Sequence, residues 1–201
     1  MKNIIIIILI FSSCQKADKL YFAKNDAEIK KISFEKKLNG FQIYTLIQLP
    51  LSEQVAKEKQ HFKITNHDLK ICITSQIILE TGFLKSKLLQ INNVLGIKKL
   101  SLRPYFDKMT IEYSNGKKIT KKQSFASFYS ISDCLHNYFT IIKGKRFLKV
   151  RQAKNYYDYC IALQNCGYAT DPEYAIKLIS IIKKIKEKMI PDLIANDFNN
   201  R

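Results

Sequence analysis

Two glutamates stand where their surroundings suggest acid–base chemistry. Glu80 closes a run with the i, i+3, i+4 spacing of one helix face, formed by Leu69, Cys72, Ile73, Gln76 and Ile77. A carboxyl in the last turn of a mostly apolar helix is partly desolvated, which raises its pKa toward the range of a general acid. Protonating the leaving oxygen of a glycosidic bond needs such an acid. On chemistry alone, the more ordinary interpretation is a helix-end glutamate that points into water.

Glu112 is the second candidate, and it lies in a segment with a different period. Residues 107–113 alternate in period two, which is typical of a strand. On such a strand Thr110 and Glu112 share one face, while Met109, Ile111 and Tyr113 share the other. The polar face lies either toward a groove or toward solvent, and the two-residue alternation alone does not decide between them.

The elements that position these glutamates have clear local signals. Residue types that cap helices occur at Thr65 to Asp68, and Gly82 is a natural stop, so we expect a helix between them. Asn115-Gly116 is a strong two-residue hairpin signal, and we expect residues 117–120 to return as the partner strand. The hairpin therefore separates two helical halves.

The rest of the chain is expected to be mostly helical. One helix starts near Ser132-Asp133, a second runs from about residue 149 to 166, and a third starts with Asp171 as its N-cap and Pro172 in its first position. Residues 42–49 read as extended or helical, and Pro50 is expected to end that segment. The fold class is therefore α+β, mainly helical.

The first fourteen residues predict export. Lys2 precedes a compact apolar run over residues 4–11, which is too short for a bilayer about 30 Å thick and has the length of a signal-peptide core. Ser12-Ser13-Cys14 follows, and small residues directly before a cysteine resemble the lipobox of bacterial lipoproteins. That resemblance implies that Cys14 is acylated and anchors the protein in a membrane. An ordinary signal, cleaved or uncleaved, is the alternative.

The net charge of +17 indicates a polyanionic partner. The basic residues are mostly lysines spread along the chain, whereas interfaces that read bases favour arginine. We therefore expect an acidic wall or lipid surface and no nucleic acid.

The remaining cysteines and the histidines point to no cofactor. Cys72, Cys134, Cys160 and Cys166 lack the paired spacing of a zinc site, and reduced core thiols are favoured over disulfides. The histidines are isolated, so we expect no metal site. They are His61, His67 and His136.

Four motifs, in order over roughly residues 65 to 185, resemble the glucosaminidase family, glycoside hydrolase family 73. Residues 75–82, SQIILETG, resemble the start of its SQxxLESGWGKS signature, and Lys85-Ser86 its end. Residues 92–98, NNVLGIK, resemble its NNLFGIK segment, and residues 111–116 resemble its hairpin. Residues 167–175, GYATDPEYA, match its GYATDPxYA segment.

The resemblance implies a lysozyme-like fold, with a helical core and a small β-hairpin lobe across a substrate groove. It makes Glu80 the general acid, puts Glu112 at the position of the second carboxylate and makes Tyr168 a tyrosine that lines the cleft. We expect the Tyr168 hydroxyl to be free to reach the sugar or its N-acetyl group. Four further residues are expected to contact substrate: Phe83, Asn92, Asn93 and Tyr113. For the two asparagines, turn chemistry alone is an equal alternative.

Two departures from the family pattern concern the substrate. Phe83-Leu84 replaces the usual Trp-Gly after the acid, and Ala126 replaces an arginine after Phe125. A phenylalanine still stacks on a sugar ring, with a smaller face than tryptophan. These changes bear on substrate preference more than on the reaction.

The sequence therefore predicts a monomeric, cofactor-free hydrolase of the bond between N-acetylglucosamine and N-acetylmuramic acid in peptidoglycan. The expected divisions are a signal peptide (1–13), a membrane tether with an N-terminal extension (14–60), the catalytic domain (61–190) and a tail (191–201). A lytic transglycosylase or muramidase on the same fold is the alternative among enzymes. A wall-binding lipoprotein without activity is the alternative outside them.

Overall fold

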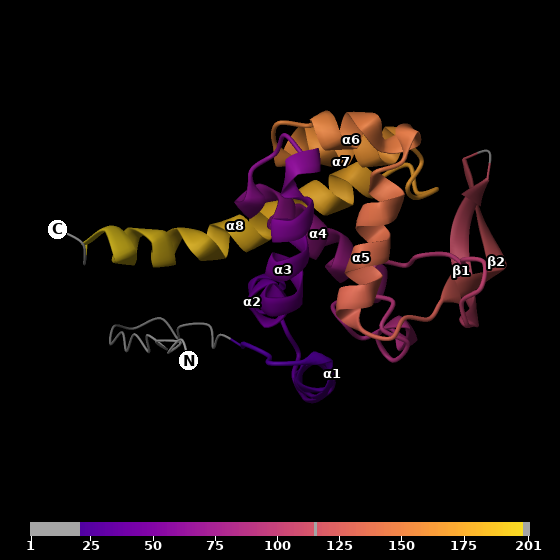
Figure 1. Ribbon diagram of the computed structural model, residues 1–201, viewed down its shortest axis with the longest axis horizontal. Coiled ribbons are helices and arrows are strands. Elements are labelled where there is room, and N and C mark those ends of the chain that lie inside the picture. The colour runs from indigo at the N-terminus through magenta and orange to yellow at the C-terminus, as the bar shows by residue number, and fades with distance from the viewer. Residues whose placement is uncertain (1–20, 115, 199–201) are drawn as a thin grey trace.

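A computed structural model describes residues 21–114 and 116–198. Its helices gather into one body, and a single two-stranded hairpin stands at one side (Figure 1). The α-helices are α1 (Asp26–Glu35), α2 (Gly40–Leu46), α3 (Gln48–Glu58), α4 (Asn66–Thr81), α5 (Ile131–Ile142), α6 (Leu148–Gln152), α7 (Tyr156–Asn165) and α8 (Tyr174–Phe198). The strands are β1 (Tyr105–Ser114) and β2 (Lys117–Ala126), and short 3-10 turns cover Lys59–His61, Lys87–Leu89 and Lys145–Phe147. The predicted α+β, mainly helical class is confirmed.

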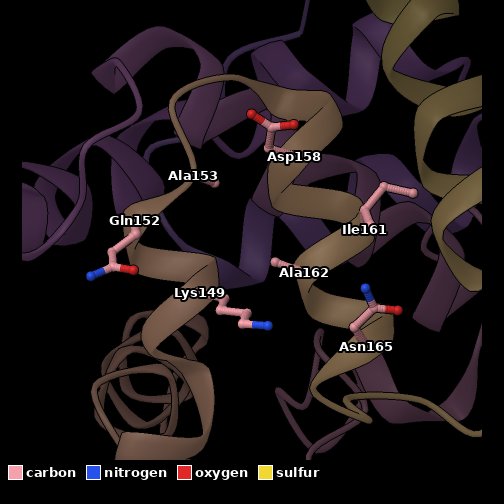
Figure 2. Close-up of a pocket in the computed structure, with 7 residues that line it drawn as sticks. All are labelled: Lys149, Gln152, Ala153, Asp158, Ile161, Ala162 and Asn165. Carbon is pink, nitrogen blue, oxygen red and sulfur yellow. The ribbon is translucent and has the colours of Figure 1, made fainter.

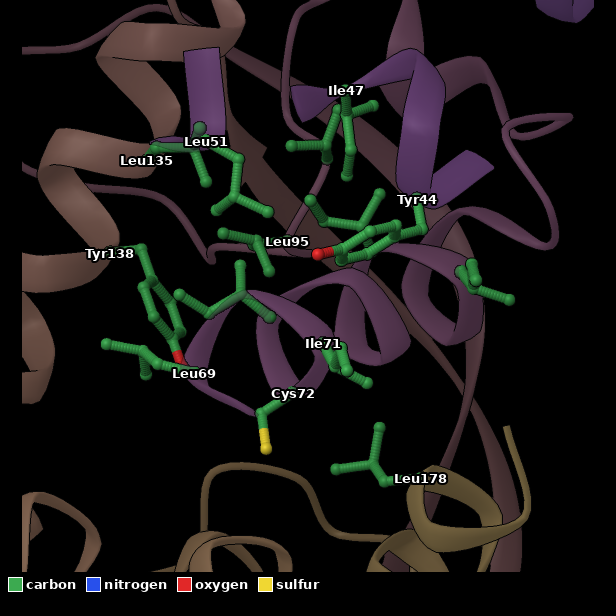
Figure 3. Packing of buried hydrophobic residues seen from close by; sticks show 14 of the residues in the cluster. Tyr44, Ile47, Leu51, Leu69, Ile71, Cys72, Leu95, Leu135, Tyr138 and Leu178 are labelled. Carbon is green, nitrogen blue, oxygen red and sulfur yellow. The ribbon is translucent and has the colours of Figure 1, made fainter. Parts of the chain in front are cut away.

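Helix α4 is the central helix, and it ends where the sequence predicts. The Thr65 side chain caps its first turn by accepting from the backbone N–H of Asp68, and Gly82 closes it in the left-handed conformation with φ of 55°. It packs against α2, α3, α7 and α8. Leu69, Ile71 and Cys72 of α4 lie in the buried apolar cluster (Figure 3). Because the side chains of α4 are buried on nearly every side, its last turn holds Glu80 in a fixed place.

Helices α2 and α3 lie within the segment predicted as a membrane tether with an N-terminal extension (14–60), and they belong to this core. Ile43, Leu46 and Leu51 are fully buried in the same apolar cluster as α4. The prediction that Pro50 ends the segment 42–49 is wrong, because Pro50 lies in the first turn of α3. A proline fits there because the first backbone N–H groups of a helix have no partner within the helix.

The hairpin is longer than the alternating segment that predicts it. β1 and β2 pair antiparallel from Tyr105↔Ala126 to Ser114↔Lys117. At the open end, the Ala126 N–H donates to the Ile97 carbonyl at 3.0 Å, which joins the hairpin to the loop after α4. The predicted hairpin between two helical halves is therefore confirmed and has a fixed base.

The helix expected over residues 149–166 is wrong, because the chain forms two helices there. α6 ends at Gln152, and Asn155 caps the start of α7 by accepting from the Asp158 N–H. Helix α8 starts at Tyr174, just after the expected Asp171, and continues across the predicted boundary at residue 190.

The four described cysteines are free, as expected, and three of them are buried. No helix of the described part is long and apolar enough to cross a bilayer. The predicted signal peptide and Cys14 lie outside the described residues.

Candidate active site

Both candidate carboxylates line one groove between the helical body and the hairpin. The groove has a volume of about 560 Å³. Glu80 comes from the last turn of α4, Glu112 from β1, and Tyr168 from the α7–α8 loop. The polar face of β1 therefore looks at the groove, and Thr110 lines it beside Glu112.

The Glu80 carboxyl is held from two sides. The buried Tyr174 hydroxyl, at the start of α8, donates to its Oε1 at 2.9 Å. On the other side, a Cβ at Gly96 would lie 2.5 Å from its Oε2, so any other residue at position 96 would displace the carboxyl.

The environment raises the pKa of Glu80 from 4.5 to about 7. Burial is the largest cause, because it disfavours the charged form. The Tyr174 hydrogen bond and the charges of Lys98 and Lys108 act in the opposite direction, and the Glu112 charge raises the pKa further. Glu80 therefore keeps its proton close to neutral pH.

Glu112 has the opposite character. Lys98 Nζ lies 2.6 Å from its Oε1, and Thr170 Oγ1 donates to its Oε2 at 2.7 Å. Desolvation alone would raise the pKa of Glu112, but the hydrogen bonds from Lys98, Thr170 and Thr110 and the lysine charge hold it below the ordinary value. Glu112 is therefore ionised at neutral pH.

Two carboxyls whose pKa values are pushed apart in one groove form an acid–base pair. Glu80 can donate a proton, and Glu112 can stabilise positive charge or accept a proton from water. This is the division of labour that the cleavage of a glycosidic bond requires.

The loop around Gly96 owes its shape to Asn93. Asn93 is fully buried, its Nδ2 donates to the carbonyls of Ile97 and Ala126 at 2.8 Å each, and its Oδ1 accepts from the Ile97 N–H at 2.9 Å. Asn92 is buried with φ of 56°, and its Nδ2 donates to the Phe128 carbonyl at 2.9 Å. These contacts favour turn chemistry over sugar contact for both asparagines.

The sequence predicted that the Tyr168 hydroxyl is free to reach a sugar, and this prediction is wrong. The hydroxyl donates to the Leu95 carbonyl at 3.0 Å. The Tyr168 ring packs against the rings of Tyr138, Phe147 and Tyr174, and this packing directs the hydroxyl toward Leu95. Tyr168 thus lines the groove with its ring.

Phe83 and Tyr113 lie outside the residues that line the groove. Phe83 follows Gly82 in a left-handed conformation, and 44% of its surface is exposed. Tyr113 donates its backbone N–H to Thr170 Oγ1 at 3.2 Å, and Lys118 lies over its ring. Substrate contact by either ring remains a prediction.

Sequence reasoning gave no role to three residues that hold the carboxylates. Lys98 and Tyr174 lie inside the quoted motifs NNVLGIK and GYATDPEYA, and so does Thr170. The motifs therefore carried the signal, but only the fold shows that these side chains meet Glu80 and Glu112.

A second hollow lies between α6 and α7, lined by Lys149, Asp158 and their neighbours (Figure 2). It contains none of the residues singled out from the sequence. The described residues also hold no group of three His, Cys, Asp or Glu placed to bind a metal ion.

The chain resembles known proteins over its helical body and hairpin. Residues 54–187 match the family described as mannosyl-glycoprotein endo-beta-N-acetylglucosaminidase. The peptidoglycan hydrolase FlgJ of Salmonella typhimurium is 32% identical over 157 residues, which are 74% of this chain and 48% of FlgJ. The exo-glucosaminidase LytG of Bacillus subtilis is 29% identical over 144 residues, 66% of this chain and 51% of LytG. The chain thus spans about half the length of these relatives.

Solved structures share the fold. A peptidoglycan hydrolase mutant from Sphingomonas sp. A1 has a TM-score of 0.60 at 27% identity, covering 72% of this chain and 97% of that one. The glycoside hydrolase domain of Salmonella typhimurium FlgJ has a TM-score of 0.56 at 25% identity, covering 82% of this chain and all of that one. These likenesses confirm the lysozyme-like fold. Since the family match spans well over half of the chain, the protein belongs to the mannosyl-glycoprotein endo-beta-N-acetylglucosaminidase (glucosaminidase) family.

Proposed function

We propose that this protein is a peptidoglycan hydrolase that cleaves the bond between N-acetylglucosamine and N-acetylmuramic acid. One observation carries the proposal: Glu80, with its pKa raised to about 7, shares a groove with an ionised Glu112. Family membership supports glycosidic chemistry, and FlgJ and LytG are described as a peptidoglycan hydrolase and an exo-glucosaminidase.

In the proposed mechanism, Glu80 protonates the glycosidic oxygen as the bond to the sugar breaks. Positive charge then develops on the sugar ring, where the Glu112 carboxylate stabilises it. That charge can be quenched in three ways, and the anomer released separates the first from the other two. If Glu112 activates a water the product is inverted, whereas attack by Glu112 or by the substrate's own N-acetyl group retains the configuration.

The test is to digest purified peptidoglycan and identify the new ends by borohydride reduction and mass spectrometry. A glucosaminidase creates reducing N-acetylglucosamine ends. Reducing N-acetylmuramic acid ends would indicate a muramidase, and anhydro sugars a lytic transglycosylase. Binding without new ends would contradict the proposed activity and indicate a wall-binding protein.

The compartment follows from the substrate, and the anchor is a separate proposal. Peptidoglycan lies outside the cytoplasm, so the protein is exported, and its net charge of +17 suits a wall that carries carboxylates. We propose that Cys14 is acylated and holds the protein on a membrane. The wild type should partition into detergent and Cys14→Ser into the aqueous phase. A wild type that stays aqueous would contradict the anchor while leaving the proposed activity intact.

A further inference from the structure

A buried chain of hydrogen bonds runs from the protein core to Glu80. Tyr159 and Tyr138 share a hydroxyl–hydroxyl bond of 2.6 Å, and Tyr138 donates to Gln76 Oε1 at 2.6 Å. Gln76 Nε2 then donates to the Tyr174 hydroxyl at 3.4 Å, and Tyr174 donates to Glu80 Oε1 at 2.9 Å. The first four residues of this chain expose at most 2% of their surface.

Each hydrogen in this chain has a direction. The amide nitrogen of Gln76 only donates, so the Tyr174 oxygen is an acceptor on that side and its own hydrogen is available to Glu80. The amide oxygen of Gln76 accepts from Tyr138, which in turn accepts from Tyr159. All donors therefore point toward the carboxyl, and such aligned bonds strengthen one another in a low-dielectric interior.

The two oxygens of Glu80 consequently differ. Oε1 is occupied by Tyr174, whereas Oε2 lies on the side of Gly96, a glycine that lines the groove. The carbonyl oxygen of a protonated carboxyl is the better acceptor, so the bond from Tyr174 to Oε1 favours the proton on Oε2.

We propose that Tyr174, backed by Gln76, Tyr138 and Tyr159, is a positioning residue that holds Oε1 of Glu80, so that Oε2 presents the proton to the substrate. The role rests on the proposed function, but the contact itself can be measured without substrate. Gln76 lies on α4 one helical turn before Glu80, and it acts on Glu80 through Tyr174.

Other charged groups around Glu80 do not depend on Tyr174. Those that influence its pKa or share its groove are Lys98, Lys99, Lys108, Glu112, Arg146 and Asp171. A change confined to the Tyr174 hydroxyl leaves all of them in place, so its effect reports on the two hydrogen bonds of that hydroxyl, the one donated to Glu80 and the one accepted from Gln76.

The experiment titrates the Glu80 carboxyl carbon by NMR in the full chain, with two matched changes at Tyr174. Tyr174→Phe removes the donor that stabilises the charged carboxylate, so the Glu80 pKa should rise by about one unit. Incorporating 3-fluorotyrosine at residue 174 makes the hydroxyl a stronger donor in the same shape, so the pKa should fall. Tyr138→Phe should raise it less, and Tyr157→Phe, an exposed residue of α7, should leave it unchanged.

Activity separates positioning from simple stabilisation. Tyr174→Phe should lower kcat about tenfold with KM unchanged, because the acid is misaligned, and should move the alkaline limb of the pH profile upward. A Glu80 pKa that stays the same in both Tyr174 variants would overturn the inference. If the pKa changes occur in a protein that cleaves no peptidoglycan, the proposed function fails and the hydrogen-bond assignment stands.

Discussion

A Cβ at Gly96 would lie 2.5 Å from Oε2 of Glu80, closer than any two such atoms can pack. The loop after α4 therefore approaches the acid too closely for a side chain at residue 96. Asn93 fixes that approach through its three hydrogen bonds to the backbone of Ile97 and Ala126.

Gly96→Ala should lower kcat/KM by about 10²-fold, because the methyl group displaces the carboxyl from its position. It should also destabilise the fold by about 1–2 kcal/mol, since Gly96 has φ of 62°. Gly82→Ala is the control, with φ of 55° and open space around the new methyl. Equal losses of activity in both variants would show that backbone strain, and not the contact with Glu80, is responsible.

Tyr168→Phe should destabilise the protein by about 1–2 kcal/mol in urea unfolding. It leaves the buried Leu95 carbonyl without the donor it has at 3.0 Å. Tyr157→Phe, on an exposed side chain, should change stability by less than about 0.5 kcal/mol. A Tyr168→Phe variant with wild-type stability and reduced activity would instead favour a hydroxyl that serves the sugar.

Glu112→Gln should reduce activity less than Glu80→Gln does, and it should move the alkaline limb of the pH profile to lower pH. The Glu112 charge raises the pKa of Glu80, so removing it lowers that pKa. The measurement is kcat/KM between pH 4 and 9 for both proteins. An unchanged alkaline limb would mean that the two carboxyls do not interact.

The central helix and the hairpin were predictable because their signals are local. Thr65 and Gly82 bound α4, and the Asn-Gly signal in the sequence predicts the reversal that pairs Ser114 with Lys117. The break between α6 and α7 was missed because Asn155 stands in a tyrosine-rich stretch that reads as continuous helix.

The environment of the carboxylates was only partly predictable. Glu80 and Glu112 were found from motif and spacing, whereas Tyr174 reaches Glu80 across 94 residues of chain, and Thr170 reaches Glu112 across 58. Such contacts depend on how helices and loops pack, and no local pattern encodes them. The prediction of a free Tyr168 hydroxyl was wrong for the same reason, because the hydroxyl bonds to Leu95, which is 73 residues away in the sequence.

The free energy of unfolding should also fall as the pH rises, because of Glu80. Its pKa in the folded protein, about 7, lies above the ordinary 4.5, so the folded carboxyl holds a proton that the unfolded chain has already released. Its contribution is full below pH 4.5 and is lost as the pH rises toward and through 7. Glu80→Gln removes this dependence, so at pH 8 the variant should be more stable than wild type by up to about 3 kcal/mol.

The difference between the two proteins should vanish near pH 4. Urea unfolding at pH 4, 6 and 8 measures it, and Glu53→Gln, on the exposed face of α3, should show no such trend. A constant difference across this range would mean that the Glu80 carboxyl is not desolvated.

The most direct measurement is the rate at which Glu80→Gln releases reducing N-acetylglucosamine ends from purified peptidoglycan at pH 6, beside wild type and Glu53→Gln. Glutamine keeps the shape and still accepts the Tyr174 hydrogen bond, but it has no proton to give. We expect a fall of at least about 10²-fold for Glu80→Gln, with Glu53→Gln at the wild-type rate. Turnover of Glu80→Gln at the wild-type rate would contradict the assignment of Glu80 as the catalytic acid.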